Sequence, residues 1–364
     1  MEFNYYMPTK IYYGRGVIDQ YKNDMENLGG KALIVTGKIS SKKNGSLMQM
    51  QSALDSLNIK YITFDEVEEN PSLETIEKAA NVGKEEKVQF VIGIGGGSPL
   101  DAAKAIAVFI KNPHVNKENI FFSKKLESLP VVAVPTTSGT GSEVTPYSIV
   151  TVHKEKTKKN LGQLVYPVIA YMDPGFTDNL PYHITVNTAI DAFTHLVESY
   201  LNRDCNLMTE IYAMKGFELF KSSFENLVGK ELTCKFRENI MLASMYGGIA
   251  ISQSGTSLPH GMGYALTYHK NIPHGLANGL LTIEYLRCFK NQEKIINMLN
   301  VLGMENIDQL DRVFQSLIQV DIEISSQEIK EYASDFANNK EKLRKHPEEV
   351  TLKNIEGIYK NSLY

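Results

Sequence analysis

The chain has 364 residues, of which 43% are hydrophobic and 22% are charged. These values are ordinary for a globular protein, and the length suits two domains because single hydrophobic cores stop growing near ~250–300 residues. The formal net charge of −4 excludes a broad electrostatic attraction to nucleic acid or to an anionic membrane. No apolar run approaches the roughly 20 residues of a membrane span, so we expect neither a nucleic acid nor a membrane as partner.

The cysteines and the N-terminal sequence indicate the cellular compartment. Cys205, Cys234 and Cys288 are odd in number and lack the C-x-x-C spacing of metal sites, so they are interpreted as reduced thiols. The opening sequence MEFNYYMPTKIYYGRG lacks the basic start and apolar stretch of a signal peptide. We therefore expect a cytoplasmic protein.

The first half of the chain alternates strand-like and helical segments. The strand-like segments are rich in β-branched residues, and the segments between them place apolar residues at helical spacing. This alternation is typical of a doubly wound parallel sheet, a Rossmann-like α/β arrangement. We predict strands at 31–36, 60–67, 88–97 and 130–137, and helices at 46–57 and 72–86.

From about residue 183 the chain changes character. Residues 188–201, 208–224 and 237–252 have helical periodicity, and strand-like runs are few. The preceding stretch DPGFTDNLP is rich in Pro, Gly and Asn, which is typical of a linker. We predict an α/β domain over residues 1–181 and an all-α domain over residues 182–364.

A glycine-rich run, GIGGGSPLDAAKAIA, follows one predicted strand and opens a helix. Its glycines let the backbone approach a ligand, and the helix start offers N–H groups and the positive dipole end to a diphosphate. We predict Ser98 as the N-cap, with Pro99 and Asp101 in the first turn, and count Asp101 as a cofactor-binding candidate. The alternative is a tight turn without a ligand, because the spacing differs from the usual G-x-G-x-x-G motif.

A second polar loop, VPTTSGTGSEVTPYS, follows the next predicted strand. Ligands of parallel α/β sheets bind at the carboxyl ends of the strands, where both loops would lie. Hydroxyl groups there can donate hydrogen bonds to phosphate or ribose oxygens; the alternative is a polar crossover loop. The hydroxyl candidates are Thr136, Thr137, Ser138, Thr140 and Ser142.

The second half contains a possible metal-ligand set. In IDAFTHLVESYL, Asp191 and His195 are four residues apart, which places both side chains on one helical face. The stretch LPHGMGYALTYHKNIPHGLANG repeats Pro-His-Gly and places His260 and His274 fourteen residues apart. One carboxylate and three imidazoles form a mixed donor set for Fe²⁺ or Zn²⁺. Alternatively, Asp191 and His195 form only a hydrogen bond on a structural helix.

In combination these motifs resemble the iron-containing (group III) alcohol dehydrogenases. The resemblance spans nearly the whole chain and is carried by FNYYMPTKIYYGRGVI, ENPSLETIEKA, IGGGSPLDAAKAIA, VPTTSGTGSEVT, DPGFTDNLP, AIDAFTHLVESYL and the Pro-His-Gly stretch. It implies a dehydroquinate synthase-like architecture, in which a dinucleotide-binding α/β domain precedes a helical domain that binds metal and substrate. The implied ligands of Fe²⁺, or sometimes Zn²⁺, are Asp191, His195, His260 and His274.

The resemblance also implies contacts to the nicotinamide dinucleotide. Lys158 matches a lysine near the nicotinamide ribose, and Lys159 is the competing match in KEKTKKNLG. The diphosphate and other cofactor contacts carried over by position are Gly96, Gly97, Ser98, Asn70, Thr136, Thr137 and Lys158.

The chain departs from the family pattern at Tyr264, four residues after His260, where many members carry a proton-relaying histidine. A phenol is a poor base near neutral pH. Tyr264 is kept as a catalytic candidate near the substrate. His269 is a possible substitute or else a solvated loop residue, and water with the cofactor ribose is another route for the proton.

A second departure concerns the choice of cofactor. NAD-selective relatives have an aspartate after the first strand, where this chain has Gly37, followed by Lys38 and Ser40. Loss of an acid beside added cations and hydroxyls accommodates a 2′-phosphate, so we predict NADP(H) in preference to NAD(H). The alternative is a lysine-rich, exposed loop tip.

The activity implied by the resemblance is reversible hydride transfer between a nicotinamide and a small primary alcohol or aldehyde. Alternatives are a glycerol or polyol dehydrogenase, a dehydroquinate synthase-like lyase, or a non-catalytic regulator that binds metal and nucleotide. The helical half lacks an evident basic cluster for a phosphorylated lyase substrate, and the complete ligand set argues against a regulator. We also expect a homodimer or higher homo-oligomer, in which the segment FNYYMPTKIYY pairs with a partner chain as in family dimers; the alternative is an edge hairpin.

Overall fold

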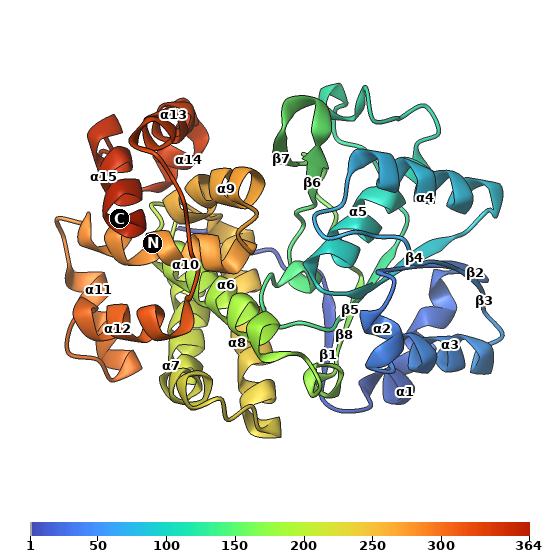
Figure 1. The fold of residues 1–364 in the computed structure, drawn as a ribbon. Helices are drawn as coiled ribbons and strands as arrows, with labels where there is room; N and C mark the ends of the chain where they lie inside the picture. The colour runs from blue at the N-terminus through green and yellow to red at the C-terminus, as the bar shows by residue number, and fades with distance from the viewer. Residues whose placement is uncertain (1) are drawn as a thin grey trace. The chain divides into compact units, whose positions relative to one another are not determined.

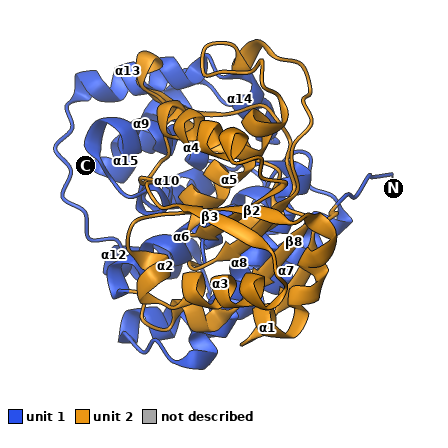
Figure 2. Cartoon of the chain, turned by 90° about the vertical axis from the view of Figure 1, so that its right-hand side faces the viewer, with its two compact units in different colours: residues 1–6, 138–140, 181–364 blue, residues 7–137, 141–180 orange. Residues whose placement is uncertain are grey.

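The computed structural model describes residues 2–364, and they form two compact units (Figure 2). Unit 1 contains residues 138–140 and 181–364 together with the N-terminal segment through Tyr6. Unit 2 contains Met7–Thr137 and Gly141–Leu180. Unit 2 is an α/β structure, whereas none of the described residues of unit 1 belongs to a strand. Within residues 2–364, no helix combines the length and apolar character that a membrane span needs.

The sheet of unit 2 has six parallel strands in the order β1-β8-β5-β4-β2-β3 (Figure 1). Strands buried on both faces of a parallel sheet are near-continuous apolar runs, and the central strands fit this description. The strands are β1 (Lys10–Tyr13), β2 (Lys31–Thr36), β3 (Lys60–Phe64), β4 (Phe90–Gly95), β5 (Val131–Pro135) and β8 (Ile169–Met172).

Helices cover both faces of this sheet because successive side chains of a strand point to opposite sides. In β2, Leu33 and Val35 face one hydrophobic cluster, which includes residues of α4 and α5. Ala32 and Ile34 face a second cluster, which includes residues of α1 and α3. The helices of unit 2 are α1 (Val17–Tyr21), α2 (Ser40–Lys43), α3 (Ser46–Ser56), α4 (Leu73–Glu85) and α5 (Gly97–Lys111). The predicted doubly wound sheet is therefore confirmed.

Three predicted strands are longer than the observed ones, and the one predicted at 130–137 spans only Val131–Pro135. The strand predicted at 60–67 ends at Phe64, because β3 lies at the sheet edge and its pairing with its only strand partner, β2, ends at Val35 and Phe64. The strand predicted at 88–97 spans Phe90–Gly95, since its pairing with β2 begins at Phe90 and the chain enters α5 at Gly97. The expected alternative of an N-terminal edge hairpin is also wrong, because β1 pairs in parallel with β8.

An antiparallel hairpin outside the main sheet was not anticipated from the sequence. It consists of β6 (Ile149–Val152) and β7 (Thr157–Asn160), joined by a short 3₁₀ turn at His153–Glu155. Lys156 completes the turn in the left-handed region, with φ of 51°. The hairpin is fastened to the rest of unit 2 by the Thr151 amide, which donates to the Pro71 carbonyl over 2.8 Å.

Unit 1 is built around α6, in which every residue from Ala189 to Tyr200 is buried. Phe193 packs edge-to-face against four other phenylalanine rings at centroid distances of 5.0–5.8 Å. A helix that is apolar all round belongs in a core, so the charged residues of α6 need a specific explanation. The helices are α6 (Tyr182–Tyr200), α7 (Leu207–Gly229), α8 (Cys234–Ser254), α9 (Leu258–Lys270), α10 (His274–Arg287), α11 (Glu293–Leu302), α12 (Ile307–Leu317), α13 (Ser326–Ala337), α14 (Lys340–Lys345) and α15 (Leu352–Leu363).

Candidate metal centre and dinucleotide-binding loops

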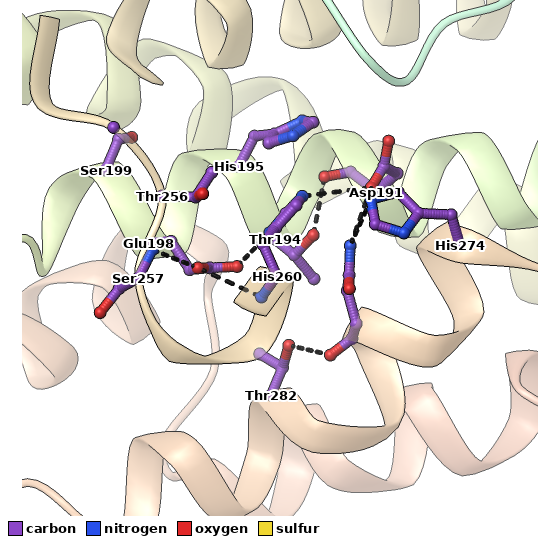
Figure 3. Close-up of polar contacts among 12 residues, drawn as sticks. Asp191, Thr194, His195, Glu198, Ser199, Thr256, Ser257, His260, His274 and Thr282 are labelled. Carbon is purple, nitrogen blue, oxygen red and sulfur yellow. Dashed lines mark hydrogen bonds and ion pairs between the residues drawn. The ribbon is translucent and has the colours of Figure 1, made fainter. Parts of the chain in front are cut away.

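Three of the predicted ligands form a tight, buried group in unit 1. Asp191 and His195 lie one turn apart on α6, and His260 reaches them from the first turn of α9 (Figure 3). Their ligand atoms all lie within 4.8 Å of one another, and the three residues are only 3–5% exposed. The structure thus brings together residues that are 69 positions apart in the sequence.

His274, the fourth predicted ligand, lies beside this group at the start of α10. Its Nε2 atom is 4.0 Å from Asp191 Oδ1, and its ring centroid is 5.3 Å from that of His260. His274 is more exposed than the other three, with 26% of its side chain accessible.

The Pro-His-Gly repeat has a structural reason at both sites. Proline suits the beginning of a helix because the N–H that it lacks would have no partner within the helix. Pro259 lies in the first turn of α9 and Pro273 directly precedes α10. The glycines permit close packing: a Cβ atom on Gly275 would lie 2.0 Å from a backbone oxygen of α6, and one on Gly261 would lie 2.3 Å from the Phe336 ring.

The charges of this group suit a divalent cation. Burial alone would favour a neutral Asp191, but the neighbouring histidines, with His195 foremost, hold the pKa of its carboxyl well below the usual range. Burial lowers the pKa of His195 to about 4, which keeps that imidazole neutral. Ionised carboxylates and neutral imidazoles are the forms that bind metals.

His260 offers the clearest sign that a cation fits. Its Nε2 atom is buried, lies 3.4 Å from Asp191 Oδ1 and makes no hydrogen bond within the described part of the chain. Although burial opposes protonation, Glu198 and Asp191 raise the pKa of His260 to about 9, so a bound cation would displace a proton there. A buried nitrogen without a hydrogen bond, facing a carboxylate, matches the needs of Fe²⁺ or Zn²⁺.

Tyr264 and His269, the two candidates for proton transfer, have different surroundings. Tyr264 is half-buried on α9, and its ring stacks on that of His274 at a centroid distance of 5.5 Å. His269 is exposed and stacks on Tyr332 of α13. It lies in the last turn of α9, so its assignment to a loop was wrong; the helix continues to Lys270.

The glycine-rich run of unit 2 forms the expected strand–turn–helix corner, but Ser98 is not its N-cap. The turn occurs one step earlier, at Gly95, whose φ of 150° is rare for other residues, and α5 begins at Gly97 with Gly96 as N-cap. Ser98 instead accepts a hydrogen bond from the Asn70 amide over 3.0 Å. Because the helix starts early, Asp101 is its fifth residue and lies outside the first turn, contrary to the prediction.

The loops after β4 and β5 meet at the carboxyl edge of the sheet. A Cβ atom on Gly96 would lie 3.1 Å from Thr137 Oγ1, so the backbone of one loop passes close to a hydroxyl of the other. Thr136 is 2% exposed at the end of β5. Such a corner, with a helix N-terminus and adjacent hydroxyl groups, fits a diphosphate.

Asp101 and Ser142, both predicted cofactor contacts, bond to each other through the Ser142 hydroxyl. Asp101 also accepts from the Ile149 amide over 2.9 Å. Lys104, which is 1% exposed, holds the same loop by donating to the carbonyls of Ser142 and Thr145 over 3.0 and 3.1 Å.

The two candidate lysines of the hairpin lie in different environments. Lys158 is 8% exposed, and its Nζ atom donates to Asn70 Oδ1 over 2.6 Å. Lys159 forms an ion pair with Glu155 and lies over the Phe121 ring. Since neighbouring strand residues point to opposite faces, only Lys158 reaches the residue that also bonds to Ser98.

The segment after β2 passes through a bend at 38–39 into a short helix, α2, and its lysines are exposed, as in the alternative of an exposed loop tip. Gly37 is half-buried, whereas Lys38 and Ser40 are exposed. Lys42 forms an ion pair with Asp65, an acid just beyond β3 that the sequence reasoning did not consider.

Comparisons with known proteins agree with this geometry. Residues 8–174 match the family described as iron-containing alcohol dehydrogenase, and residues 185–363 match its C-terminal counterpart. The chain belongs to the iron-containing alcohol dehydrogenase family. The resemblance that we expected from the sequence is thereby confirmed.

Two curated relatives and two solved structures illustrate the likeness. The chain is 30% identical to the NADPH-dependent butanol dehydrogenase of Clostridium saccharobutylicum, over 84% of this chain and 80% of that one. It is 31% identical to the 1,3-propanediol dehydrogenase of Citrobacter freundii, over 85% and 81% of the two chains. Crystal structures of an iron-containing alcohol dehydrogenase and of one from Thermotoga maritima align with TM-scores of 0.93 and 0.92, at 35% and 36% identity, over 100% of this chain and 99% of each of theirs. The fold class is also confirmed.

Three buried residues of this iron-containing alcohol dehydrogenase were missed by the sequence reasoning. Lys104 holds the hydroxyl-rich loop, Glu198 bonds to His260, and Asn278 donates through Nδ2 to Asp191 Oδ1 over 3.2 Å. The Asn278 Nδ2 atom also lies 3.2 Å from His274 Nε2. Glu198 and Asn278 follow His195 and His274 by three and four residues, so helical spacing from a predicted ligand is the signal that could have found them.

Proposed function

We propose that the chain is a metal-dependent alcohol dehydrogenase that interconverts a small primary alcohol and its aldehyde with NAD(P)H as the hydride carrier. The observation that carries the proposal is the buried group of Asp191, His195 and His260. In this group the Nε2 atom of His260 makes no hydrogen bond within the described residues and faces the Asp191 carboxylate. Membership of the family supports the same reaction class, since relatives of this chain bear the names of alcohol dehydrogenases and of a lactaldehyde reductase.

In this proposal Asp191, His195, His260 and His274 hold Fe²⁺ or Zn²⁺. Such an ion, when bound, supplies Lewis acidity, which polarises a carbonyl oxygen and stabilises the negative charge that develops there. The ionised Asp191 carboxylate lowers the net charge of the site, and the Asn278 amide holds that carboxylate in place. His195 is oriented from its other side, because its Nδ1 atom lies 3.3 Å from the Gly139 carbonyl oxygen.

We propose that the predicted domains, 1–181 and 182–364, carry the dinucleotide and the metal with the substrate, respectively. Unit 2 supports the first assignment through the N-terminus of α5 and the hydroxyl groups that follow β5. Lys158 and Asn70 form a polar pair linked to Ser98, which suits a ribose with its hydroxyl groups. A bound nicotinamide would donate or accept the hydride, and these residues would orient it.

NADP(H) is the proposed cofactor in preference to NAD(H). Gly37 removes the carboxylate that would repel a 2′-phosphate, and Lys38 and Ser40 are exposed nearby on the chain. Lys42 contributes less to the attraction of a 2′-phosphate, because its charge is already paired with that of Asp65. The name of the clostridial butanol dehydrogenase, which specifies NADPH, supports this choice.

Tyr264 is proposed to shape the site beside His274 and to donate a hydrogen bond, because its ring stacks on that ligand. A phenol is a poor base near neutral pH. A bound cofactor would supply ribose hydroxyl groups, which with water would give the proton another route than Tyr264.

A homodimer in the cytoplasm is the proposed state of the protein. Strand β1 lies at the edge of the sheet, where backbone groups can pair with a partner chain. The three cysteines are free thiols, as in proteins of reducing compartments. Light scattering during size-exclusion chromatography would measure the mass; a monomer would contradict the proposal.

The function is tested by His274→Ala, with bound iron and NADPH-dependent reduction of butanal measured on the same preparation. We expect both to be lost, because His274 is a proposed ligand. His269→Ala is the matched control, since His269 lies five residues before His274, is exposed and stacks on Tyr332. Full activity in metal-free His274→Ala protein would overturn the assignment. Wild-type protein that binds metal and nucleotide but reduces no aldehyde with either cofactor would favour a regulator.

A further inference from the structure

Glu198 is a fully buried acid on α6 that the proposed reaction does not use. A buried carboxylate is costly unless hydrogen-bond donors surround it. Its two oxygens have separate partners in unit 1 (Figure 3). Oε2 accepts from the Ser257 amide over 2.6 Å and from the His260 amide over 3.5 Å, while Oε1 bonds to Nδ1 of the His260 ring.

The contacts of Oε2 fix the beginning of α9. The first amides of a helix have no partners within it, and Ser257, the N-cap residue, makes no side-chain hydrogen bond to them. Glu198 supplies the missing acceptor from a neighbouring helix, and its negative charge suits the positive end of the helix dipole. The turn of α9 that carries His260 is thus held against α6.

The contact of Oε1 fixes the ring itself. Because a carboxylate only accepts, Nδ1 of His260 carries the hydrogen, and Nε2 is the nitrogen that faces Asp191. The His195 ring stacks on the His260 ring at a centroid distance of 4.3 Å and restricts its rotation further. The result is a buried Nε2 atom aimed at the Asp191 carboxylate.

We propose that Glu198 is a positioning residue of the metal centre, which holds His260 by its ring and by its helix turn and thereby sets the affinity and geometry of the site for a divalent cation. This inference rests on the proposed function, in that His260 is taken as a ligand. A carboxylate bonded to the outer nitrogen of a ligating histidine orients the ring and makes it a stronger donor.

The surroundings of Glu198 explain why the acid is tolerated. Lys342 of α14 interacts electrostatically with Glu198. Its Nζ atom bonds to the hydroxyl group of Thr256, the residue before Ser257, and lies 3.5 Å from the Thr256 carbonyl oxygen. A lysine of α14 that is bonded to this short loop offsets the charge that Glu198 places beside the proposed ligands.

The experiment measures Zn²⁺ affinity by competition with a chelator and the visible spectrum of the Co²⁺ form, so neither readout depends on turnover. Glu198→Gln keeps the size of the side chain but removes its charge and one of its acceptor groups. We expect about 10–100-fold weaker Zn²⁺ binding and a changed Co²⁺ spectrum. Ser199→Ala is the matched control, because Ser199 is the next residue of α6, equally buried, and bonds to the Leu196 carbonyl; its affinity and spectrum should equal those of the wild type.

Repeating Glu198→Gln in two backgrounds distinguishes an effect of Glu198 through His260 from an effect on overall stability. Each background lacks one proposed ligand and should not retain iron on purification, so its weaker residual Zn²⁺ affinity is measured by direct titration. In His260→Ala protein the Glu198→Gln substitution should cause no further loss of this residual affinity, whereas in His274→Ala protein it should weaken the residual affinity by the full factor seen in the wild type. Equal losses in both backgrounds would overturn the positioning role. If Glu198→Gln does not fold, as judged by circular dichroism of the metal-free protein, Glu198→Asp replaces it in the same cycle, with a smaller loss expected because its charge remains.

Failure of this inference is distinguishable from failure of the proposed function. Wild-type protein that binds no Zn²⁺ or Co²⁺ would overturn both. Tight binding by wild type and Glu198→Gln alike would overturn the role of Glu198 alone.

Discussion

The two candidate sites are built from different chemistry. In unit 1, ionisable side chains from buried helices converge, and Asp191, His195 and His260 lie within 4.8 Å of one another. In unit 2, the site consists of backbone turns and small hydroxyl residues at the ends of strands, with Gly96 close to Thr137. Buried charges interact strongly and tolerate no missing partner, whereas a backbone cradle depends on shape. Substitutions should therefore act through charge in unit 1 and through space in unit 2.

The largest effect is expected for Asp191→Asn, which keeps the shape of the ligand and removes its charge. Mutation of a residue that only hydrogen-bonds to a metal ligand already lowers metal affinity or activity by about 10–100-fold. Loss of the charge of a ligand itself should therefore lower turnover by more than about 100-fold and release the metal. Metal analysis and steady-state rates of aldehyde reduction check this. Asp204→Asn is the control, since Asp204 forms a surface ion pair with Lys345, a type of pair that contributes little. Retention of metal and activity by Asp191→Asn would contradict the charge-based view of unit 1.

Removal of the metal comes next in size. A ligand that binds only the folded state stabilises it by about 2.7 kcal/mol when present at 100 times its Kd. We expect a chelator to lower the free energy of unfolding of wild-type protein by about this amount, measured by urea denaturation at fixed total metal. Asp191→Asn protein, which lacks a charged ligand, should show no change with chelator. Equal stability of wild type with and without chelator would argue against a metal in unit 1.

Gly96→Ala tests the role of shape in unit 2. Gly96 has φ of −73° and ψ of −164°, which other residues adopt, so only the added Cβ atom matters, 3.1 Å from Thr137 Oγ1. Because small displacements in a binding site are costly, we expect the KM for NADPH to rise roughly tenfold while bound metal stays unchanged. Gly357→Ala is the control, since a Cβ atom there meets nothing within 4 Å. An unchanged KM would show that the space beside Gly96 and Thr137 is too wide for an added Cβ atom to disturb cofactor binding.

The predictable parts of the molecule have local causes. The four proposed ligands were predictable because Asp191 and His195 share one helical face and because Pro-His-Gly marks two helix starts. The central strands β2, β4 and β5 were found because strands buried on both faces are continuous apolar runs.

The parts that were missed depend on distant contacts. Lys104 gains its role from partners 38–43 positions away, which no local pattern reveals. Helical spacing marks Glu198 as a neighbour of His195, but its bond to His260, 62 positions away, is not visible in the sequence. The hairpin of β6 and β7 was not predicted, because its second strand, TKKN, lacks apolar residues and its turn has no glycine. Ser98 was misjudged as an N-cap because its hydroxyl accepts from Asn70, a residue of another loop.

The smallest predicted effect contrasts the two buried acids that differ most, Asp191 in unit 1 and Glu143 in unit 2. The histidines keep Asp191 ionised, whereas burial raises the pKa of Glu143 from 4.5 to about 7, despite the nearby charge of Lys104. Because the folded protein binds this proton more tightly than the unfolded chain, the stabilisation is present below pH 4.5 and is lost as the pH rises through about 7.

Between pH 6 and pH 7 the free energy of unfolding of the wild type should fall by about 1 kcal/mol on this account. Glu143→Gln removes the titrating group and should flatten the profile, which urea denaturation at a series of pH values would measure. Gln preserves the size of the side chain. A difference between the two proteins in the slope of the free energy of unfolding against pH therefore reports proton binding by Glu143, whereas a difference that is the same at every pH reports packing. Identical slopes for the two proteins would show that Glu143 stays ionised through contact with Lys104. Both units would then contain a buried ionised acid, and the two sites would differ only in the ligands that they bind.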